Sequence, residues 1–337
     1  MFSEAAVSLK GRRVSEAHLR LLERAWILFE VWMVGAMGFS AAILQDNGRD
    51  MAFALSLYIE FLHKSGRPYN SGKNAVLAVQ HRFRHLRRCL QEAWDDLVTW
   101  RMELPVQPRR PAPELVVWAL FSQSLLSGLS QSSTDLAPIR FGICCLLMFR
   151  GLLRPAEMWK LKFEDVTFIY LADRGEVAVL RLIAAKNQRA MGRWQSIVIR
   201  CKVVVRWLKW LAHGQPRAGL IMVGGRKRFL ELLEITLQLL HLQKDFIRPS
   251  SFRAGGATAL FVSDVEISKI KVLGRWKQLA TLDYYLQEAS AALVEADVGP
   301  NLTLQLHQLL VCCRFLRRPP VQPLPLWKTN SLEELQL

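Results

Sequence analysis

The sequence predicts a mainly α-helical protein that also contains one small antiparallel β-sheet. Three observations support this fold class. Apolar residues recur at helical intervals in the amino-terminal part, short β-branched runs are grouped between residues 166 and 200, and a proline-rich stretch separates two parts of the chain. The 337 residues are sufficient for two or more domains that each have a core.

The residues before the proline-rich stretch are predicted to form helices. Residues 50–64 and 71–101 carry apolar side chains at helical spacing. We therefore expect a helical extension over residues 1–45 and a helical domain over residues 46–112. A basic run at 81–88 is expected on the polar side of the second stretch, and its candidate phosphate contacts are Arg82, Arg84, Arg87 and Arg88. A solvated helix face without a ligand has the same composition.

One segment of the amino-terminal part is strongly apolar. Residues 26–44 form a nearly unbroken apolar run that only Glu30 and Ser40 interrupt. Such a segment is compatible with a marginal membrane span or with a buried amphipathic helix. A carboxylate at the centre of a bilayer costs about 2.5–3.5 kcal/mol, so the buried helix is the favoured interpretation.

The proline-rich stretch marks a boundary between two domains. Residues 105–113 contain four prolines, which exclude a helix and favour an extended linker. A second domain is expected from residue 113 to residue 298. Its β-branched runs, bounded by turn residues, predict strands at 166–171, 176–183 and 195–200. The remaining residues, 299–337, are expected to form a helix at 302–315 and a loose proline-rich tail.

The charge balance and the cysteines restrict the class of partner and the compartment. The chain has 45 basic and 29 acidic residues, a net charge of +16, which favours a polyanion such as nucleic acid, although anionic membranes attract basic chains too. The six cysteines do not show the Cys-x-x-Cys spacing of zinc sites. They indicate a reducing, intracellular compartment.

Four separated residues form a combination that suits chemistry on a phosphodiester. Arg154 lies in a Gly-Leu-Leu-Arg-Pro-Ala-Glu segment, Arg253 ends a Ser-Ser-Phe-Arg segment, and Trp276 and Tyr285 follow them. A planar guanidinium binds two non-bridging phosphate oxygens at once, so two arginines stabilise a phosphoryl-transfer transition state without a metal. A tyrosine hydroxyl attacks phosphorus and holds it covalently. The phosphodiester bond energy is then conserved, and strands are cut and rejoined without a nucleotide cofactor.

These segments resemble the motifs of the tyrosine recombinases, the family of the phage integrases and Cre-type enzymes. Residues 151–157 are similar to the turn that carries the first catalytic arginine of that family. Residues 250–253 resemble its His-x-x-Arg motif, with Ser250 in place of histidine. Leu-Gly-Arg-Trp at 273–276 resembles the following Leu-Gly-x-(His/Trp) element, and Tyr285 comes nine residues after Trp276, as the family nucleophile does. The resemblance covers about residues 46–295.

The resemblance implies a fold and a mechanism. The fold is mainly α, with a helical core-binding domain that closes one side of a clamp on duplex DNA and an α+β, integrase-like catalytic domain at 113–298. Arg154 and Arg253 hold the phosphate, Trp276 and Ser250 assist them, and Tyr285 attacks to give a 3′-phosphotyrosyl link. Lys186, on the expected turn between the second and third strands, protonates the leaving 5′ oxygen.

The same resemblance specifies what the reaction needs. No cofactor, neither a metal nor a nucleotide, is implied. The partner is double-stranded DNA, on which recombination of two duplexes requires a homotetramer, whereas a monomer that performed the same cleavage would behave as a type IB topoisomerase. The chain is expected inside the cell with DNA, in the nucleus of a eukaryote or in the cytoplasm or nucleoid of a prokaryote, as the product of a mobile element.

Each site residue also has a structural alternative. Arg154 could pair with Glu157 one helical turn later, and Trp276 could be an ordinary core indole. Ser250 or Ser251 could cap the helix that carries Arg253. Arg189 and Arg193 compete with Lys186 for the role of acid, and Tyr284 neighbours Tyr285, although the spacing favours Tyr285 as the nucleophile.

Two further function classes stay open at this point. Serine donates a hydrogen bond but is no acid or base near neutral pH, so Ser250 leaves room for a catalytically inactive DNA-binding relic of a mobile-element recombinase. The apolar segment 26–44 leaves room for a membrane-associated basic helical protein. The DNA target, and the choice among integration, excision and inversion, do not follow from the sequence.

Overall fold

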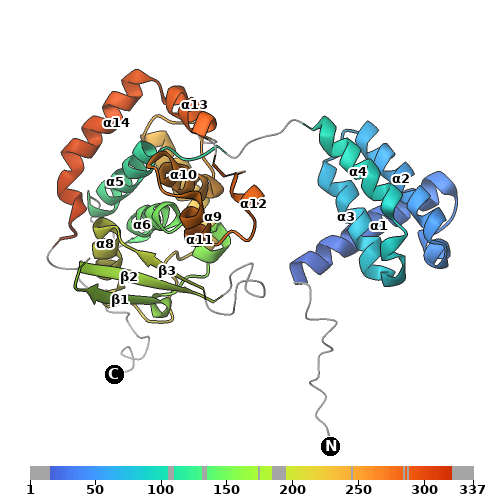
Figure 1. Cartoon of the computed structure of the whole chain (residues 1–337), viewed down its shortest axis with the longest axis horizontal. Coiled ribbons are helices and arrows are strands. Elements are labelled where there is room, and N and C mark those ends of the chain that lie inside the picture. The colour runs from blue at the N-terminus through green and yellow to red at the C-terminus, as the bar shows by residue number, and fades with distance from the viewer. Residues whose placement is uncertain are drawn as a thin grey trace, which may run out of the picture. The chain divides into compact units, whose positions relative to one another are not determined.

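The chain folds as two units, which are Met1–Gln107 and Pro108–Leu337. The computed structural model describes residues 16–104, 110–130, 135–173, 175–183, 195–243, 246–283, 285–286 and 288–320. The division falls inside the proline-rich stretch. The regular elements among the described residues of unit 1 are all helices, and unit 2 combines helices with a small sheet, in agreement with the mainly α fold class (Figure 1).

Unit 1 is a bundle of helices around its own apolar core. Its elements are α1 (Glu16–Met37), η2 (Ala41–Asp46), α2 (Gly48–Lys64), α3 (Tyr69–Arg82), η3 (Arg84–Arg88) and α4 (Gln91–Glu103). The side chain of Asn47 caps α2 by accepting a hydrogen bond from the Asp50 N–H at 3.1 Å. Gly72 of α3 lies so close to α4 that an added Cβ would come within 3.1 Å of the Trp100 ring. The small residue therefore allows α3 and α4 to pack closely.

The apolar segment 26–44 belongs mainly to α1 and contributes to this core. Trp26, Phe29 and Met33 are buried on one side of the helix. Glu30 accepts hydrogen bonds from the Ser40 hydroxyl and, at 3.1 Å, from the Ala41 N–H, so its carboxylate fixes the turn after α1. Among the described residues, every helix is too short or too polar to span a lipid bilayer.

The stretch 71–101 differs from its prediction, because it is not continuously helical. Helix α3 ends at Arg82, the basic run forms the short 3-10 helix η3, and α4 begins at Gln91. Leu86 and Leu90 are buried in the core of unit 1 within this interruption. Burial of these two leucines draws the chain inward and leaves the neighbouring arginines on a turn rather than along a helix face.

Unit 2 begins with two long helices and the sheet. Its elements in order are α5 (Glu114–Ser130), α6 (Ala137–Arg150), α7 (Pro155–Met158), η4 (Phe163–Asp165), β1 (Val166–Leu171), β2 (Gly175–Leu182), β3 (Gln195–Ile199), α8 (Lys202–Ala212), α9 (Gly225–Leu239), α10 (Pro249–Val262), α11 (Ile267–Gly274), α12 (Leu279–Asp283), α13 (Glu288–Val298), α14 (Pro300–Cys312) and η5 (Cys313–Arg317). Helix α8 packs on both β2 and α6, so the sheet lies at one edge of the unit (Figure 1).

The sheet has the antiparallel arrangement that the sequence predicts. Its strand order is β1-β2-β3, with Phe168 opposite Ala178 and Ala178 opposite Ile199. Leu180 and Ile197 are buried on the side that faces the core. The observed strand ends lie within one residue of the predicted ones. The predicted acid Lys186 falls between β2 and β3, outside the described residues.

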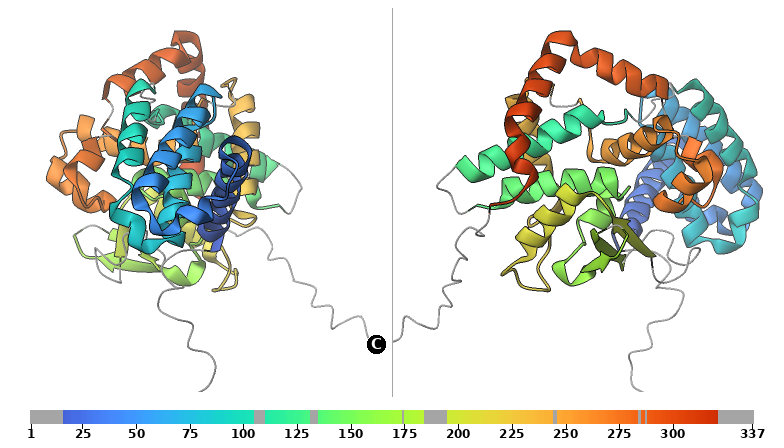
Figure 2. Two further views of the ribbon diagram at one scale, coloured as in Figure 1. Left: turned by 90° about the vertical axis from the view of Figure 1, so that its right-hand side faces the viewer. Right: turned by 60° about the vertical axis from the view of Figure 1, so that its left-hand side comes forward.

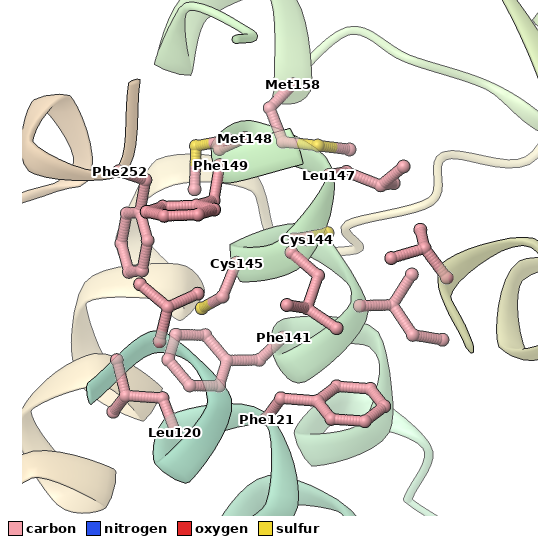
Figure 3. Close-up of a cluster of buried hydrophobic side chains, with 14 of the residues drawn as sticks. Leu120, Phe121, Phe141, Cys144, Cys145, Leu147, Met148, Phe149, Met158 and Phe252 are labelled. Carbon is pink, nitrogen blue, oxygen red and sulfur yellow. The ribbon is translucent and has the colours of Figure 1, made fainter. Parts of the chain in front are cut away.

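The core of unit 2 is built around α6. Every residue of this helix from Ile139 to Phe149 is buried, and Figure 3 shows its side chains between those of α5 and α10. Helix α10 approaches α6 closely, because an added Cβ on Gly256 would lie 2.1 Å from the Phe149 carbonyl oxygen and one on Gly255 would lie 2.1 Å from that of Ala112. The glycine pair thus sets the position of α10, and with it the position of Arg253, which lies two residues before the pair in the same helix.

The carboxy-terminal helix packs within its own unit. Helix α14 lies against α5 (Figure 2). Leu306, Cys313 and Leu316 are buried in the main core of unit 2, and the Trp207 indole N–H donates a hydrogen bond of 2.6 Å to the Leu316 carbonyl oxygen. Residues 300–317 therefore complete the core of unit 2.

Candidate active site

Arg154 lies in the tight connection between α6 and α7. Leu152 has a positive φ of 48°, which turns the chain sharply after α6. The Arg154 N–H donates to Glu157 Oε2 at 2.8 Å, and its guanidinium donates to Glu157 Oε1 at 2.8 Å and to the Arg275 carbonyl oxygen at 3.4 Å. The expected pair with Glu157 exists, but the Glu157 side chain is only 3% exposed. The pair is therefore a buried part of a site, unlike a solvated surface pair.

Arg253 projects from α10 into the same region. Only 2% of the residue is exposed. Its guanidinium donates to the carbonyl oxygens of Leu152 and Gly274, so it ties the turn after α6 to the end of α11. The guanidinium carbon lies 4.1 Å from the centroid of the Trp276 ring and 5.7 Å from that of the Tyr285 ring. Stacking on an indole compensates in part for burying this charge.

Trp276 and Tyr285 form the aromatic side of the site. Their ring centroids are 5.2 Å apart with an interplanar angle of 63°, an edge-to-face contact. Gly274 makes room for the indole, because an added Cβ would lie 1.5 Å from its ring. The Thr258 hydroxyl donates to the Tyr285 carbonyl oxygen at 3.1 Å and so holds the segment after α12 against α10.

Arg275 is a member of the site that the sequence motifs did not identify. It adopts a left-handed conformation, φ 59° and ψ 43°, at the end of α11. The residue is 5% exposed, and its Nη2 donates to Glu157 Oε2 at 2.7 Å and to the Leu152 carbonyl oxygen at 3.4 Å. Its position between Gly274 and Trp276 was the available signal, since both of its neighbours belong to the recognised motif.

The arginine cluster, defined as Arg154, Arg253 and Arg275 around Glu157, carries an excess of positive charge. Arg154 and Arg275 pair with Glu157, and Arg253 experiences the charge of the same carboxylate, so three guanidinium groups face one negative charge and two positive charges are uncompensated within the cluster. Burial, together with the charges of Arg154 and Arg275, lowers the pKa of Arg253 to about 9, although Glu157 and Tyr285 oppose that shift. Burial also lowers the pKa of Arg275, with Glu157 opposing the shift and Arg154 adding to it. An anionic ligand would relieve this repulsion.

Among the other residues that the sequence proposed for the site in unit 2, Ser250 and Ser251 lie within the described residues. Ser250 is half-buried in the first turn of α10, one turn before Arg253. The predicted capping role of Ser250 or Ser251 is wrong, because the helix begins at Pro249 and its N-cap is Arg248. The Ser251 hydroxyl instead accepts a hydrogen bond from the Arg248 N–H at 3.1 Å. Lys186, its competitors Arg189 and Arg193, and Tyr284 all lie outside the described residues.

The four predicted DNA contacts lie in unit 1. Arg82 ends α3, and Arg84, Arg87 and Arg88 belong to η3, with all four exposed. The Arg82 guanidinium lies 4.8 Å from the centroid of the Trp26 ring, and its Nη1 is 3.8 Å from Glu23 Oε1. The other three arginines extend a basic surface on the η3 turn.

Comparison with known proteins identifies the fold. No protein-family model matches the sequence, and the search of curated proteins gave no match. One similar structure is that of the XerH site-specific recombinase bound to its difH substrate in a pre-cleavage complex. Its TM-score is 0.52 and its sequence identity is 14%, and the match covers 82% of this chain and 78% of that chain. The Tn1549 transposon integrase, in complex with transposon right end DNA, has a TM-score of 0.53 and 12% identity over 84% of this chain and 94% of that one. The chain therefore has the mainly α-helical, integrase-like fold of these site-specific recombinases.

Proposed function

We propose that the protein cleaves and rejoins DNA strands at specific sites through a covalent 3′-phosphotyrosine intermediate. One observation carries the proposal: Arg154, Arg253, Trp276 and Tyr285 come from separate parts of the sequence and meet in one positively charged cluster. The fold shared with recombinases that were solved on DNA supports the same activity.

The proposed reaction is a transfer of phosphorus between two hydroxyl groups. Arg154 and Arg253 bind the non-bridging oxygens of one phosphodiester, and Tyr285 Oη gives its proton to water and attacks the phosphorus. The bond to the 5′ oxygen breaks, and that oxygen takes a proton from Lys186 and leaves as a hydroxyl. Attack by a 5′ hydroxyl on the phosphotyrosine reverses these steps and joins the strands.

The geometry of Arg253 is compatible with this role. A guanidinium has five N–H donors, of which Arg253 gives one to each of two main-chain carbonyl oxygens. The remaining donors are available to a phosphate that reaches the cluster. The Tyr285 ring, 5.7 Å from the guanidinium carbon, is near enough for its hydroxyl and Arg253 to act on one phosphorus.

The proposed partner is duplex DNA inside the cell, bound by both units. Arg82, Arg84, Arg87 and Arg88 contact phosphates along the duplex, and Ser250 donates a hydrogen bond to the scissile phosphate. Recombination of two duplexes places four copies of the chain on the DNA. The net charge of +16 supports a polyanionic partner.

A nicked suicide duplex tests the proposal. Sites are first selected from a random duplex pool by binding to the whole protein, and a nick is then placed so that cleavage releases a short strand that cannot rejoin. We expect a protein–DNA adduct that survives denaturation, disappears in Tyr285→Phe and persists in Tyr284→Phe. An adduct lost in Tyr284→Phe but kept in Tyr285→Phe would reassign the nucleophile.

An inactive DNA-binding protein is the second candidate, and Ser250 favours it. A serine hydroxyl donates a hydrogen bond but does not ionise near neutral pH, so the phosphate lacks an acid or base at this position. Salt-sensitive binding of the selected duplex without any adduct would establish this candidate over the first.

A further inference from the structure

We infer that Arg275 is a third phosphate-binding residue of the arginine cluster, which rests on the function proposed above and extends its substrate contacts. Arg275 connects the two arginines of the motifs. Its Nη2 shares Glu157 with Arg154 and shares the Leu152 carbonyl oxygen with Arg253. Its own carbonyl oxygen accepts a hydrogen bond of 3.4 Å from Arg154. A phosphate bound by the other two arginines thus lies beside Arg275.

Buried donors without partners indicate that the cluster is built for a ligand. Nε and Nη1 of Arg275 and Nε of Arg253 are buried and have no hydrogen-bond partner within the described part of the chain. Buried N–H groups are normally satisfied, since an unpaired one loses its hydration without compensation. Three such groups on two neighbouring guanidiniums are best satisfied by one acceptor with several oxygens, and phosphate has that chemistry.

The backbone at Arg275 supports a functional role for its side chain. The left-handed conformation at the end of α11 is one that glycine adopts freely and that other residues adopt at a free-energy cost. If the position served only to end the helix, glycine would be the stabilising choice. An arginine at this position, 5% exposed and beside two other cations, adds strain and repulsion. Both are explained if its charge acts on a bound anion.

The net positive charge of the arginine cluster matches the negative charge of the transition state in the proposed reaction. Without Arg275, the cluster would have two cations and one carboxylate, an excess of one charge, which suits a phosphodiester. With Arg275 the excess is two. Attack of a deprotonated phenol on a singly charged phosphodiester spreads two negative charges over the reacting group. Arg275 therefore favours the transition state over the bound substrate.

Inorganic phosphate is the probe that tests this inference in the whole protein. Its affinity is measured from the rise of the melting temperature with phosphate concentration at constant ionic strength. We expect Arg275→Gln and Arg275→Gly to bind at least about tenfold more weakly than the unaltered protein. Lys269→Gln is the matched control, because it removes one exposed charge from the same helix, α11, and should leave phosphate affinity unchanged.

Arg275→Lys separates charge from donor geometry. A lysine keeps the positive charge but cannot reach Glu157 and a phosphate together, so we expect an affinity between those of the unaltered protein and Arg275→Gln. Circular dichroism without phosphate identifies the folded variants, and Arg275→Lys decides the outcome if the other two do not fold. Unchanged phosphate affinity in every folded Arg275 variant, or no phosphate binding by the unaltered protein, would overturn the inference.

The DNA adduct assay separates this inference from the proposed function. If phosphate binding depends on Arg275 and no adduct forms on DNA, the inference stands and the strand-cleavage proposal fails. If the adduct forms in Arg275→Gln at the rate of the unaltered protein, strand cleavage stands and the inference fails. Tyr285→Phe should form no adduct, because the attacking hydroxyl is missing, while it keeps the three arginines that bind phosphate.

Discussion

Glu157 is the residue that allows three arginines to lie together. Its two carboxylate oxygens accept hydrogen bonds from Arg154 at 2.8 Å and from Arg275 at 2.7 Å, and its side chain is 3% exposed. A buried carboxylate in such a network fixes the positions of its cations while it reduces their repulsion. The two arginines are therefore positioned by one shared partner.

Removal of this carboxylate should destabilise unit 2. Glu157→Gln keeps the side-chain shape but leaves buried cations without a counter-charge, and we expect a loss of about 3–5 kcal/mol in the free energy of unfolding. Urea denaturation measures the loss, and inorganic phosphate should restore part of it. Glu164→Gln, which breaks the exposed pair with Lys162 at 3.0 Å, is the control and should change stability by about 1 kcal/mol or less. Equal effects of the two changes would contradict the structural role of Glu157.

The pH dependence of anion binding follows from the lowered pKa of Arg253. The side chain is charged below about 9 and loses its charge as the pH rises through that value. The affinity for sulfate, whose own charge is constant in this range, should therefore fall as the pH passes about 9. In the unfolded chain Arg253 keeps its proton to higher pH, so above about 9 the unfolded state binds more protons and this group raises the free energy of unfolding with pH.

Arg275→Gln supplies an internal check on that pH dependence. The charge of Arg275 is one of the causes that lower the pKa of Arg253, so its removal should shift the loss of sulfate binding to higher pH. Calorimetric titration of sulfate at several pH values measures the shift. A loss of binding at the same pH in both proteins would show that Arg275 does not act on Arg253 electrostatically.

At the scale of single residues, the sequence motifs predicted most but not all of the residues that meet in the candidate active site. The motifs identified Arg154, Arg253, Trp276 and Tyr285, and the structure brings these four together. Arg275 was missed because a pattern cannot show that a residue between two recognised positions turns inward. The capping prediction failed because Pro249 occupies the first helical position, so the N-cap is Arg248, two residues before Ser250.

Helix α10 is the element that determines where the cluster forms. It carries Arg253, and its glycine pair allows it to approach α6 and the chain at Ala112. Because the added Cβ of either residue would meet a main-chain oxygen at 2.1 Å, neither contact is relieved by moving a flexible side chain. The position of the helix, and hence of Arg253, depends on the absence of a Cβ atom at both glycines.

Gly256→Ala should therefore displace α10. We expect a loss of about 1–3 kcal/mol or more in the free energy of unfolding, and a weaker affinity for phosphate because Arg253 moves with the helix. The control is Gly35→Ala in α1, where an added Cβ meets nothing within 4 Å. That change should stabilise the protein by about 0.5–1 kcal/mol, since alanine is the better helix former. Denaturation and phosphate titration of the two variants check both expectations.

The elements themselves differ in how well the sequence predicts them. The strands were found because β-branched runs and turn residues alternate at 166–200, and the sheet pairs as expected. The interruption between α3 and α4 was not found, because helical spacing continues on both sides of it. Burial of Leu86 and Leu90, a tertiary effect, produces the turn.

For the whole molecule, the separation into two units matters most for the proposed binding of DNA. Each unit has its own apolar core, and the cluster lies wholly in unit 2 while the predicted phosphate contacts on η3 lie in unit 1. Different mutations should then affect the affinity for DNA and the reaction at the arginine cluster. Changes in η3 are expected to weaken DNA binding without affecting phosphate binding at the cluster.

Salt dependence of duplex binding tests this separation. If Arg87 contacts a phosphate, Arg87→Gln should reduce the slope of log affinity against log salt concentration by about one. Arg101→Gln, which removes an exposed arginine from α4 in the same unit, is the matched control and should leave the slope unchanged. Fluorescence anisotropy with a labelled duplex measures both slopes. Identical slopes for Arg87→Gln and the unaltered protein would remove η3 from the proposed DNA surface.

The packing of residues 300–317 has a practical consequence. The Leu316 carbonyl oxygen accepts the Trp207 indole N–H, and Leu306, Cys313 and Leu316 fill the main core of unit 2. A shortened version that stopped at the end of the motif-bearing region would lack these residues, expose the apolar core surface that they cover and favour aggregation. Truncated versions made for crystallisation or enzymology should therefore retain the polypeptide through Arg317.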